Sequence, residues 1–302
     1  MLEYPYSLWS TDINLSSEKS IKLDNQQETK LNLFNLIVGS SETLRGRLLC
    51  NPNFYLNKNS TFVYWLIGFT EGDGSFIINK TGYLEFKITQ SSPDAQILFK
   101  IKKFLGFGSV MKQCKISNTH CFRVRSQKHL LIIIHLLNGK LHLKNRLIQF
   151  INFVNAYNNC YNSKVVVILE LASISLNNAW LSGFTDAEGC FNISLVKRSD
   201  KYTQIFVRYI LSQQDARLFF LNLGKLIHGK ISYLKSYNGY NLTVNLTKSK
   251  IIVKYFTRYP LQTKKKIDYI RWLKVRTLVL EKKHRTDCGL QEIKLIASKI
   301  NN

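Results

Sequence analysis

A stretch of twelve residues occurs twice in this chain, and this repeat constrains the fold more than any other feature. Residues 65–76 read WLIGFTEGDGSF, and residues 180–191, which lie 115 positions later, read WLSGFTDAEGCF. Seven of the twelve positions are identical, and two more exchange one acidic residue for the other. Self-similarity at a fixed offset predicts a structural unit that is present twice.

The similarity continues downstream of both copies, in the same order and at nearly the same spacing. The matching segments are residues 88–90 with 211–213, residues 105–110 with 226–231, and residues 143–146 with 263–266. We therefore predict one domain that has been duplicated. Its parts are an N-terminal extension over residues 1–60, a first half over 61–158, a linker over 159–178 and a second half over 179–302.

Within each half the hydrophobic period changes between that of a helix and that of a strand, which predicts an α+β unit. The repeated motif reads as a helix that stops at Gly74 or Gly189. Alternating residues then predict a hairpin, with Leu84, Phe86 and Ile88 inward and its turn at residues 81–82. An amphipathic helix over residues 94–105 and a strand over 121–125 follow, and Asn238-Gly239 predicts a type I′ hairpin turn.

The charge of the chain points to a polyanion. Its 43 Lys and Arg residues against 19 Asp and Glu residues give a net charge of +24. Residues 1–60 are neutral, whereas residues 61–160 carry +9 and residues 177–302 carry +15. Such an excess favours nucleic acid over an anionic membrane surface as the partner. The most apolar run, residues 130–137, is much shorter than the roughly 20 residues of a membrane span.

Small residues recur at helical spacing inside both motifs. Gly68 and Gly72 lie four positions apart, and so do Gly183 and Ala187. A glycine inside a helix costs about 1 kcal/mol relative to alanine, so its presence needs a reason. Stripes of small residues let two helix backbones approach closely. We expect the two motif helices to form one tight interface on a pseudo-twofold axis.

Four acidic residues stand at the C-terminal ends of these helices: Glu71, Asp73, Asp186 and Glu188. The helix dipole is negative there and opposes them, so carboxylates that also face each other favour a bound cation. Oxygen donors of this kind suit Mg²⁺. The plainer interpretations are surface acids beside a glycine C-cap, and duplication of the whole set argues against them. Paired carboxylates also serve glycosidases, but sugar cleavage gives no reason for the charge of +24.

Residues 66–74 (LIGFTEGDG) and 181–189 (LSGFTDAEG) resemble the two signature motifs of a single-chain LAGLIDADG homing endonuclease. The resemblance covers roughly residues 61–300 and extends to Tyr259-Pro-Leu261 and to residues 282–293. It implies two αββαββα halves, whose motif helices form the central interface and whose antiparallel sheets form a DNA-binding saddle.

The resemblance also implies a site-specific double-strand DNA endonuclease that hydrolyses two phosphodiesters across the minor groove. Its metal ligands would be the carboxylates of Asp73 and Glu188, with the carbonyls of Gly72 and Ala187. The ion would be Mg²⁺ or Mn²⁺, with Ca²⁺ able to bind without supporting cleavage. Further catalytic residues would be polar groups near the attacking water, Gln90 and Gln213, and transition-state cations, Lys144 and Lys264. A strand-end glutamine and a solvated helix lysine are the plainer readings of these four residues, and Glu71 and Asp186 are expected to cap the partner helix.

Sequence readout is expected from outward-facing strand positions, by hydrogen bonds to base edges. The candidates in the first half are Lys80, Tyr83, Lys87, Arg123 and Arg125. Those in the second half are Asn192, Ser194, Lys197, Arg198, Arg208, Lys235 and Tyr237. The two halves differ at nearly all these positions, which predicts a long, non-palindromic target read by a monomer.

Three further points concern cellular context. Residues 1–60 are either a leader read through from an upstream exon or a folded cap on the first half. The Asn-, Lys- and Ile-rich composition and the lack of an import signal favour synthesis inside an organelle, the mitochondrion over the chloroplast. The competing function is that of an intron maturase, an RNA-binding splicing cofactor with reduced or no cleavage. Since both metal positions keep a carboxylate, the sequence favours cleavage.

Overall fold

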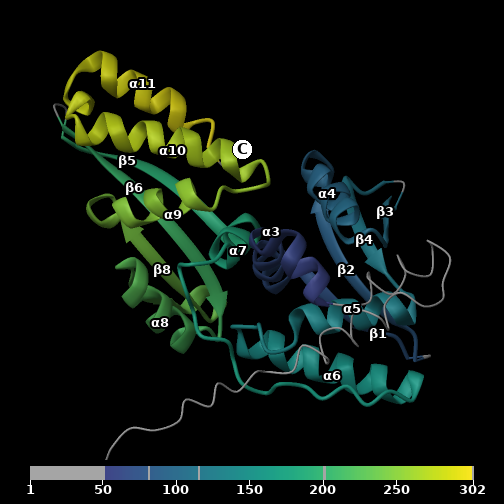
Figure 1. Ribbon diagram of the computed structural model, residues 1–302. Coiled ribbons are helices and arrows are strands. Elements are labelled where there is room, and N and C mark those ends of the chain that lie inside the picture. Colours follow the sequence, from purple (N-terminus) through teal and green to yellow (C-terminus); the bar gives the residue numbers. More distant parts are fainter. Residues whose placement is uncertain (1–51, 81, 115, 200–201, 301–302) are drawn as a thin grey trace, which may run out of the picture. The chain divides into compact units, whose positions relative to one another are not determined.

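The computed structural model describes residues 52–80, 82–114, 116–199 and 202–300. All of them lie in the second of two compact units, Arg45–Asn302. Most of the predicted N-terminal extension therefore lies outside the described residues. Within this unit the predicted α+β duplication is confirmed (Figure 1).

The two halves repeat one order of elements, to which the second half adds a final helix. The first half consists of α3 (Pro52–Asp73), β1 (Gly74–Ile78), β2 (Leu84–Ser91), α4 (Ala95–Leu105), β3 (Ser109–Lys112), β4 (Thr119–Val124), α5 (Gln127–Leu137) and α6 (Lys144–Tyr161). The second half consists of α7 (Trp180–Glu188), β5 (Gly189–Ser199), β6 (Tyr202–Gln214), α8 (Arg217–Ile227), β7 (Lys230–Leu234), β8 (Gly239–Asn245), α9 (Lys250–Arg258), α10 (Lys265–Leu280) and α11 (Asp287–Ala297).

Each half contains a four-stranded antiparallel sheet with the same strand order, β1-β2-β4-β3 in one and β5-β6-β8-β7 in the other. Leu84, Phe86 and Ile88 are buried, as their alternation predicted. The equivalent strand of the second sheet buries Tyr209 and Leu211. Because side chains alternate along a strand, each sheet turns one apolar face to its helices and presents the other face outward.

The predicted amphipathic helix is α4, which buries Ile97, Leu98, Ile101 and Leu105 along one side. It ends at Gly106, whose φ of 79° lies in the left-handed region that glycine adopts without strain. Both motif helices stop at the predicted glycines, since α3 ends at Asp73 and α7 ends at Glu188.

The start of the first half differs from the prediction. Helix α3 begins at Pro52 and is kinked at Asn59, whose side-chain oxygen accepts a hydrogen bond of 2.9 Å from the backbone N–H of Phe62. Before the kink, the fully buried Tyr55 donates its hydroxyl to the carbonyl of Leu105 at 2.9 Å. Helix α3 thus begins before the predicted start of the first half, and Tyr55 packs in the core of that half.

Two other local predictions need correction. The turn before β8 is not a two-residue type I′ turn: residues 235–237 form a 3₁₀ turn, and Asn238 alone takes a positive φ, 51°. The side-chain amide of Gln214 donates to the carbonyl of Tyr237, which anchors this longer loop. Helix α6 continues to Tyr161, so the connection between the halves begins three residues later than predicted.

Among the described residues, no helix is long and apolar enough to cross a membrane. The apolar side chains instead form one continuous core that runs through both halves.

Candidate catalytic site at the helix interface

Helices α3 and α7 lie side by side between the two sheets (Figure 1). A Cβ atom on Gly183 would lie 1.8 Å from the carbonyl oxygen of Trp65, and one on Gly68 would lie 2.0 Å from that of Trp180. A Cβ atom on Gly72 would lie 2.2 Å from the Cβ of Ala187. The predicted small-residue interface is therefore present, and backbone meets backbone along it.

This close approach brings the last acidic residues of the two helices together. Gly72 precedes Asp73, and a Cβ on Gly72 would also lie 3.1 Å from the Cγ of Glu188. Asp73 accepts a hydrogen bond of 2.5 Å from the side-chain amide of the predicted Gln90. Burial raises the pKa of the Asp73 carboxyl to about 6, an effect that the hydrogen bond from Gln90 opposes and the charge of Glu188 reinforces.

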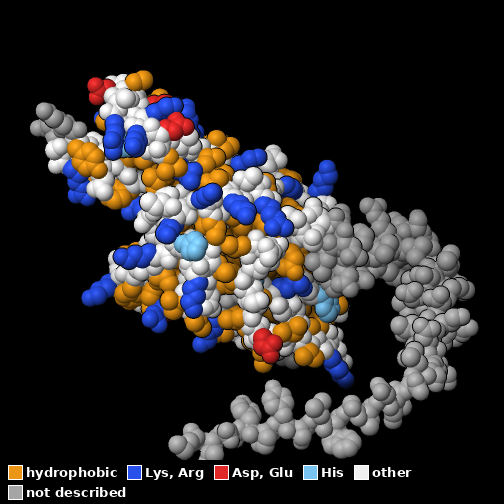
Figure 2. Space-filling view, turned by 60° about the vertical axis from the view of Figure 1, so that its left-hand side comes forward, with side chains coloured by type: hydrophobic (Ala, Val, Ile, Leu, Met, Phe, Trp, Pro, Cys, Tyr) orange, Lys and Arg blue, Asp and Glu red, His pale blue; other side chains and the backbone are white. Residues whose placement is uncertain are grey.

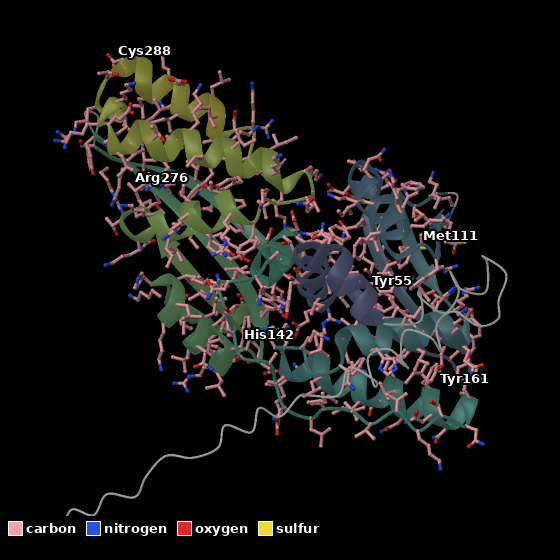
Figure 3. The ribbon with its side chains drawn as sticks, viewed as in Figure 1. Tyr55, Met111, His142, Tyr161, Arg276 and Cys288 are labelled. Carbon is pink, nitrogen blue, oxygen red and sulfur yellow. The ribbon has the colours of Figure 1, made fainter. Side chains whose placement is uncertain are left out.

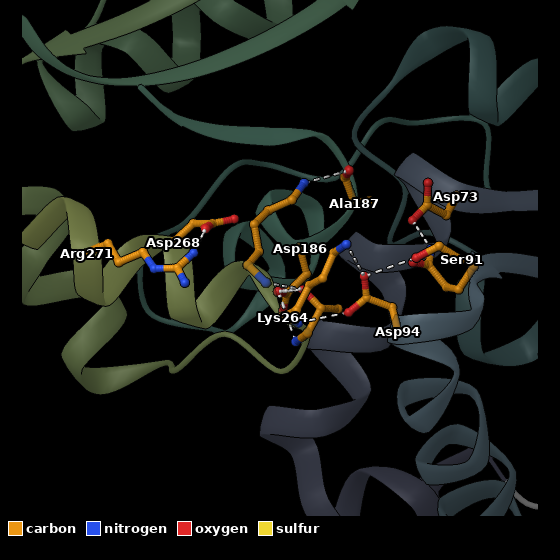
Figure 4. Close-up of polar contacts among 11 residues, drawn as sticks. Asp73, Ser91, Asp94, Asp186, Ala187, Lys264, Asp268 and Arg271 are labelled. Atoms are coloured by element: carbon orange, nitrogen blue, oxygen red, sulfur yellow. Dashed lines mark hydrogen bonds and ion pairs between the residues drawn. The ribbon is translucent and has the colours of Figure 1, made fainter. Parts of the chain in front are cut away.

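A lysine of the second half completes this side of the site. The ammonium group of Lys265, the first residue of α10, donates to the carbonyl of Ala187 at 2.9 Å (Figure 4). Burial lowers the pKa of Lys265, while the carboxylates of Asp186, Asp73 and Glu188 oppose that shift. A positive charge thus lies among the acids, where it balances part of their repulsion.

An arginine of the first half makes equivalent contacts at the C-terminal end of α3. Arg146 of α6 donates to the carbonyl of Glu71 at 2.7 Å, to that of Gly72 at 2.5 Å and to that of Gly74 at 3.0 Å. The guanidinium group neutralises the negative end of the α3 dipole, since its fixed fork of donors matches several carbonyls at once.

Lys265 and Arg146 donate to carbonyls at the ends of the motif helices, whereas the predicted Lys264 and Lys144 lie elsewhere. The side chain of Lys264 is half exposed, and its ammonium lies 3.9 Å from a carboxylate oxygen of Asp94. Lys144 is exposed at the first position of α6. The structure therefore favours the two other cations, because their charged groups reach the ends of the motif helices.

The predicted glutamines lie in two separate cavities. Gln90, Asp73 and Lys264 line one of about 560 Å³. Gln213 and Lys144 line another of about 800 Å³, together with Arg146. Each cavity combines a strand end of one half with the start of α6 or α10 from the other half.

The first acidic residue of each motif accepts several hydrogen bonds. Glu71 accepts from the backbone N–H groups of His142 and Leu143, each at 2.8 Å, and from the indole N–H of Trp180 at 2.7 Å. The imidazole of His142 lies 3.3 Å from the same carboxylate and beside the paired helices (Figure 3).

Asp186 has the matching set of partners. It accepts from the backbone N–H of Gln262 at 2.7 Å, from the hydroxyl of Thr263 at 2.6 Å and from the indole N–H of Trp65 at 2.8 Å. Glu71 and Asp186 thus bind the segment just before the helix of their own half, α6 or α10, and a tryptophan of the opposite motif helix.

On the outward face of the first sheet, a buried acid holds two of the predicted DNA-binding residues. Glu85, 4% exposed, accepts from the Nε of Arg125 at 2.6 Å and lies 3.2 Å from the Nε of Arg123. The guanidinium of Arg125 also lies over the ring of Tyr83, 5.1 Å from its centroid. The other two predicted residues, Lys80 and Lys87, lie in the β1–β2 turn and on β2.

The second sheet carries a comparable polar surface. Asn192 faces Arg208 across the strand pair and accepts from it at 2.8 and 3.1 Å. Arg198 donates to Gln204 at 2.9 Å, and Tyr237 donates to Asn241 at 2.6 Å. The remaining predicted residues are Ser194, Lys197 and Lys235, the first two on β5 and the third in the turn before β8. Polar side chains in these positions can contact either a base edge or a phosphate.

The donor set fits a hard divalent cation. Two carboxylates and two carbonyls supply only oxygen ligands, as Mg²⁺ and Ca²⁺ prefer, and each carbonyl keeps a lone pair besides the one that Arg146 or Lys265 uses. Within the described residues, no three His, Cys, Asp or Glu side chains gather to hold a metal. Asp73, Glu188 and the carbonyls of Gly72 and Ala187 are the residues that would hold an ion here.

Sequence reasoning missed four residues of this site: Trp65, Trp180, Arg146 and Lys265. The two tryptophans could have been found from the sequence, because each is the first residue of a copy of the twelve-residue repeat. Arg146 lay inside the aligned segment 143–146, but the alignment did not show which basic residue of each segment turns inward.

A family model described as LAGLIDADG endonuclease matches the chain twice, over residues 66–157 and 181–276. The two matched regions fall within the two halves of the fold.

Similar proteins are encoded in introns. Probable intron-encoded endonuclease 4 of Neurospora crassa is 50% identical over 248 residues, 82% of this chain and 46% of that protein. A cox1 intron-2 protein of Schizosaccharomyces pombe is 32% identical over 268 residues, 85% of this chain and 80% of that protein. The intron-encoded RNA maturase bI4 of Saccharomyces cerevisiae is 27% identical over 205 residues, 57% of this chain and 30% of that protein. The chain thus spans about half the length of the first of these relatives.

Solved structures share the fold. The LAGLIDADG meganuclease I-AabMI bound to uncleaved DNA matches with a TM-score of 0.68 and 25% identity, over 80% of this chain and 99% of that chain. The meganuclease I-SmaMI, bound to its uncleaved DNA target in the presence of calcium ions, matches with a TM-score of 0.65 and 20% identity, over 80% of this chain and 99% of that one.

Proposed function

This chain belongs to the LAGLIDADG endonuclease family, and we propose that it is a site-specific homing endonuclease that hydrolyses both strands of a DNA duplex. The observation that carries the proposal is the meeting of Asp73 and Glu188 at the ends of two helices in backbone contact. The two scissile phosphates of a duplex cut across the minor groove, which is about 6 Å wide, require two acids this close together.

A divalent metal ion held by the two carboxylates and the carbonyls of Gly72 and Ala187 would polarise the phosphates and lower the pKa of an attacking water. Gln90 would orient Asp73, with which it shares a hydrogen bond of 2.5 Å. Lys265 and Arg146 would offset the charge that develops on the phosphates in the transition state. The similar I-SmaMI binds its uncleaved DNA target in the presence of calcium ions, which supports a metal site, and Mg²⁺ is the ion we propose for cleavage.

The outward faces of the two sheets would read the DNA. Asn192 with Arg208 in one half and Arg123 with Arg125 in the other offer different donors and acceptors, so we propose a non-palindromic target read by one chain. The DNA in the similar I-AabMI complex supports a duplex partner. The intron-encoded relatives support synthesis inside mitochondria, and the reported relatives give no support to a chloroplast.

Selection of cleaved duplexes from a random library in the presence of Mg²⁺ tests this function. We expect a single long target sequence, cut on both strands by the wild type. Asp73→Asn and Glu188→Gln should bind this target with nearly unchanged affinity and fail to cut at least one strand. Cleavage by both variants at the wild-type rate would refute the assignment. Binding of a selected sequence by the wild type without any cleavage would identify an inactive relic.

The second candidate function is that of an intron maturase, and the outer surface of α9 favours it. Residues 216–267 contain eleven basic and no acidic residues. Lys250, Lys254 and Arg258 follow one exposed side of α9, while Phe256 packs against the inner face of the sheet. Figure 2, turned to bring the second half forward, shows many Lys and Arg side chains and few acidic ones. A duplex on the outward face of the sheet cannot cover this side.

Charge removal separates the two functions. If the chain is a maturase, Lys250→Gln, Lys254→Gln and Arg258→Gln together should weaken binding of the host intron RNA at least tenfold and leave DNA cleavage intact. The double variant of Asp73 and Glu188 should do the opposite. RNA binding that does not change with the charge of α9 would argue against a maturase surface on this helix.

A further inference from the structure

Each motif helix sends an indole N–H across the interface to the first acid of the other motif. Trp65 of α3 donates to Asp186 of α7 at 2.8 Å, and Trp180 of α7 donates to Glu71 of α3 at 2.7 Å. Both acids are buried, with Asp186 4% and Glu71 1% exposed. The two bonds are related by the pseudo-twofold axis of the duplication.

We propose that Trp65 and Trp180 are positioning residues, each of which fixes the catalytic cation of the opposite half. This inference rests on the proposed cleavage function. Trp65 of the first half would position Lys265 of the second half, and Trp180 of the second half would position Arg146 of the first half.

The path from Trp65 to Lys265 consists of consecutive contacts. Asp186 binds the indole with one side-chain oxygen and also uses both oxygens to hold Gln262 and Thr263. The hydroxyl of Thr263 then accepts from the backbone N–H of Lys265 at 3.3 Å. Lys265, two residues after Thr263, donates from its ammonium group to the carbonyl of Ala187, the residue after Asp186. A rotation of the carboxylate would therefore move the start of α10 and, with it, the ammonium group.

The path from Trp180 to Arg146 is equivalent. Glu71 binds the indole and holds the backbone N–H groups of His142 and Leu143, which precede α6. Leu143 in turn accepts through its carbonyl from the N–H of Leu147, so it sets the first turn of α6. Arg146 lies in that turn, and its guanidinium group donates a hydrogen bond to the carbonyl of Glu71.

The hydrogen bonds of the two indole N–H groups can be separated from the stacking of the indole rings. The rings already have apolar partners, since Trp65 stacks on Phe69 at 4.6 Å and Trp180 on Phe184 at 4.9 Å. A phenylalanine at either position would keep this stacking and remove the donor. The carboxylate then loses a hydrogen bond in a buried site and must reorient to find another, because unsatisfied buried polar groups are costly.

Strand-resolved nicking of a supercoiled plasmid that carries the selected target tests the proposal. We expect Trp65→Phe to slow cleavage of one strand about tenfold and Trp180→Phe to slow the other strand by a similar factor, with DNA affinity within about twofold of the wild type. Equal slowing of both strands by each variant, or slowing of the same strand by both, would overturn the proposal. A wild type that does not cut refutes the proposed function instead.

A double-mutant cycle tests the path itself. If Trp65 acts through Lys265, Trp65→Phe should have no further effect on the rate in a Lys265→Gln background, and the same holds for Trp180 with Arg146→Gln. Additive effects would contradict the path. Trp272→Phe is the matched control: its indole is fully buried and donates to the carbonyl of Arg208 at 3.0 Å, away from the interface. Any effect of this control should be the same for both strands.

Amide hydrogen exchange measured by NMR gives a readout that needs no cleavage. Trp65→Phe should accelerate exchange at Gln262 and Thr263 but not at His142 and Leu143, and Trp180→Phe should do the reverse. Unchanged exchange at both pairs would overturn the proposal. If a phenylalanine variant does not fold, benzothienylalanine at the same position keeps the double ring without the N–H, and the same pattern is expected.

Discussion

A Cβ atom on Gly68 would lie 2.0 Å from the carbonyl oxygen of Trp180, which is closer than any real Cβ contact. The obstacle is the backbone of the opposite helix, so no side-chain rotation can relieve it. Gly68→Ala should therefore force α3 and α7 apart and destabilise the fold by about 3 kcal/mol or more, at the upper end of overpacking costs. Chemical denaturation followed by tryptophan fluorescence would measure this loss.

Gly224→Ala is the control for that substitution. Gly224 also lies inside a helix, α8, but a Cβ there would lie 3.1 Å from a terminal methyl group of Leu242 and 3.3 Å from the carbonyl oxygen of Gly229, both much farther than the 2.0 Å at Gly68. The gain in helix propensity, about 1 kcal/mol, should offset much of the cost of these two contacts. Equal destabilisation by the two variants would show that the interface is looser than described.

The sequence predicted the interface because the chain contains it twice. Gly68 with Gly72 and Gly183 with Ala187 repeat at one spacing, and only a close helix pair explains such a costly repeat. The inward residues of β2 and α4 were predictable for a related reason, since their periods of 2 and 3.6 are local properties.

The cations next to the acids could not be predicted in the same way. Residues 143–146 contain two basic side chains and residues 263–266 contain three, and which of them points inward depends on where α6 and α10 begin. That start is set by hydrogen bonds from His142 and Thr263 to Glu71 and Asp186, which are distant in sequence. The burial of Glu85 could not be predicted either, because an acidic residue on the outward face of a strand is expected to be exposed.

Asp73 makes the stability of the metal-free protein depend on pH. Its folded pKa of about 6 is above the ordinary value of 3.8, so the folded state binds the proton more tightly than the unfolded state. The resulting stabilisation is complete below pH 3.8 and is lost as the pH rises through about 6. Asp73→Asn, which stays neutral, should be more stable than the wild type at pH 8 by about 1–3 kcal/mol.

The comparison is made with EDTA present, because a bound cation would favour the ionised carboxylate. Urea denaturation of both proteins at pH 4 and pH 8 would measure the difference, which should be close to zero at the lower pH. A constant difference across this range would show that burial of Asp73 does not govern its ionisation.

Glu85 should limit the non-specific binding of DNA. It pairs with Arg123 and Arg125 on the proposed DNA-binding face, so part of their charge is already balanced. Glu85→Gln should raise the affinity for a random duplex several-fold and steepen its salt dependence, because more phosphate counterions are released. Fluorescence anisotropy at several salt concentrations would measure both quantities.

Glu281→Gln removes the same charge elsewhere and serves as the control. Glu281 is exposed and pairs with Lys283 at 2.8 Å, beyond the end of α10. If this variant changes DNA binding as much as Glu85→Gln does, net charge rather than the placement of the two arginines sets the affinity.

Lys265 and Lys264 are neighbours in sequence, yet they should differ sharply in catalysis. The Lys265 ammonium bonds the carbonyl of Ala187 among the acids, whereas that of Lys264 lies near Asp94 and solvent. Lys265→Gln should lower the single-turnover cleavage rate about 100-fold, as expected when a preorganised cation is removed from a buried site. Lys264→Gln removes an equal charge and should cost only a few-fold. Single-turnover rates with excess enzyme would separate catalysis from binding, and a larger loss at Lys264 would restore the assignment made from the sequence.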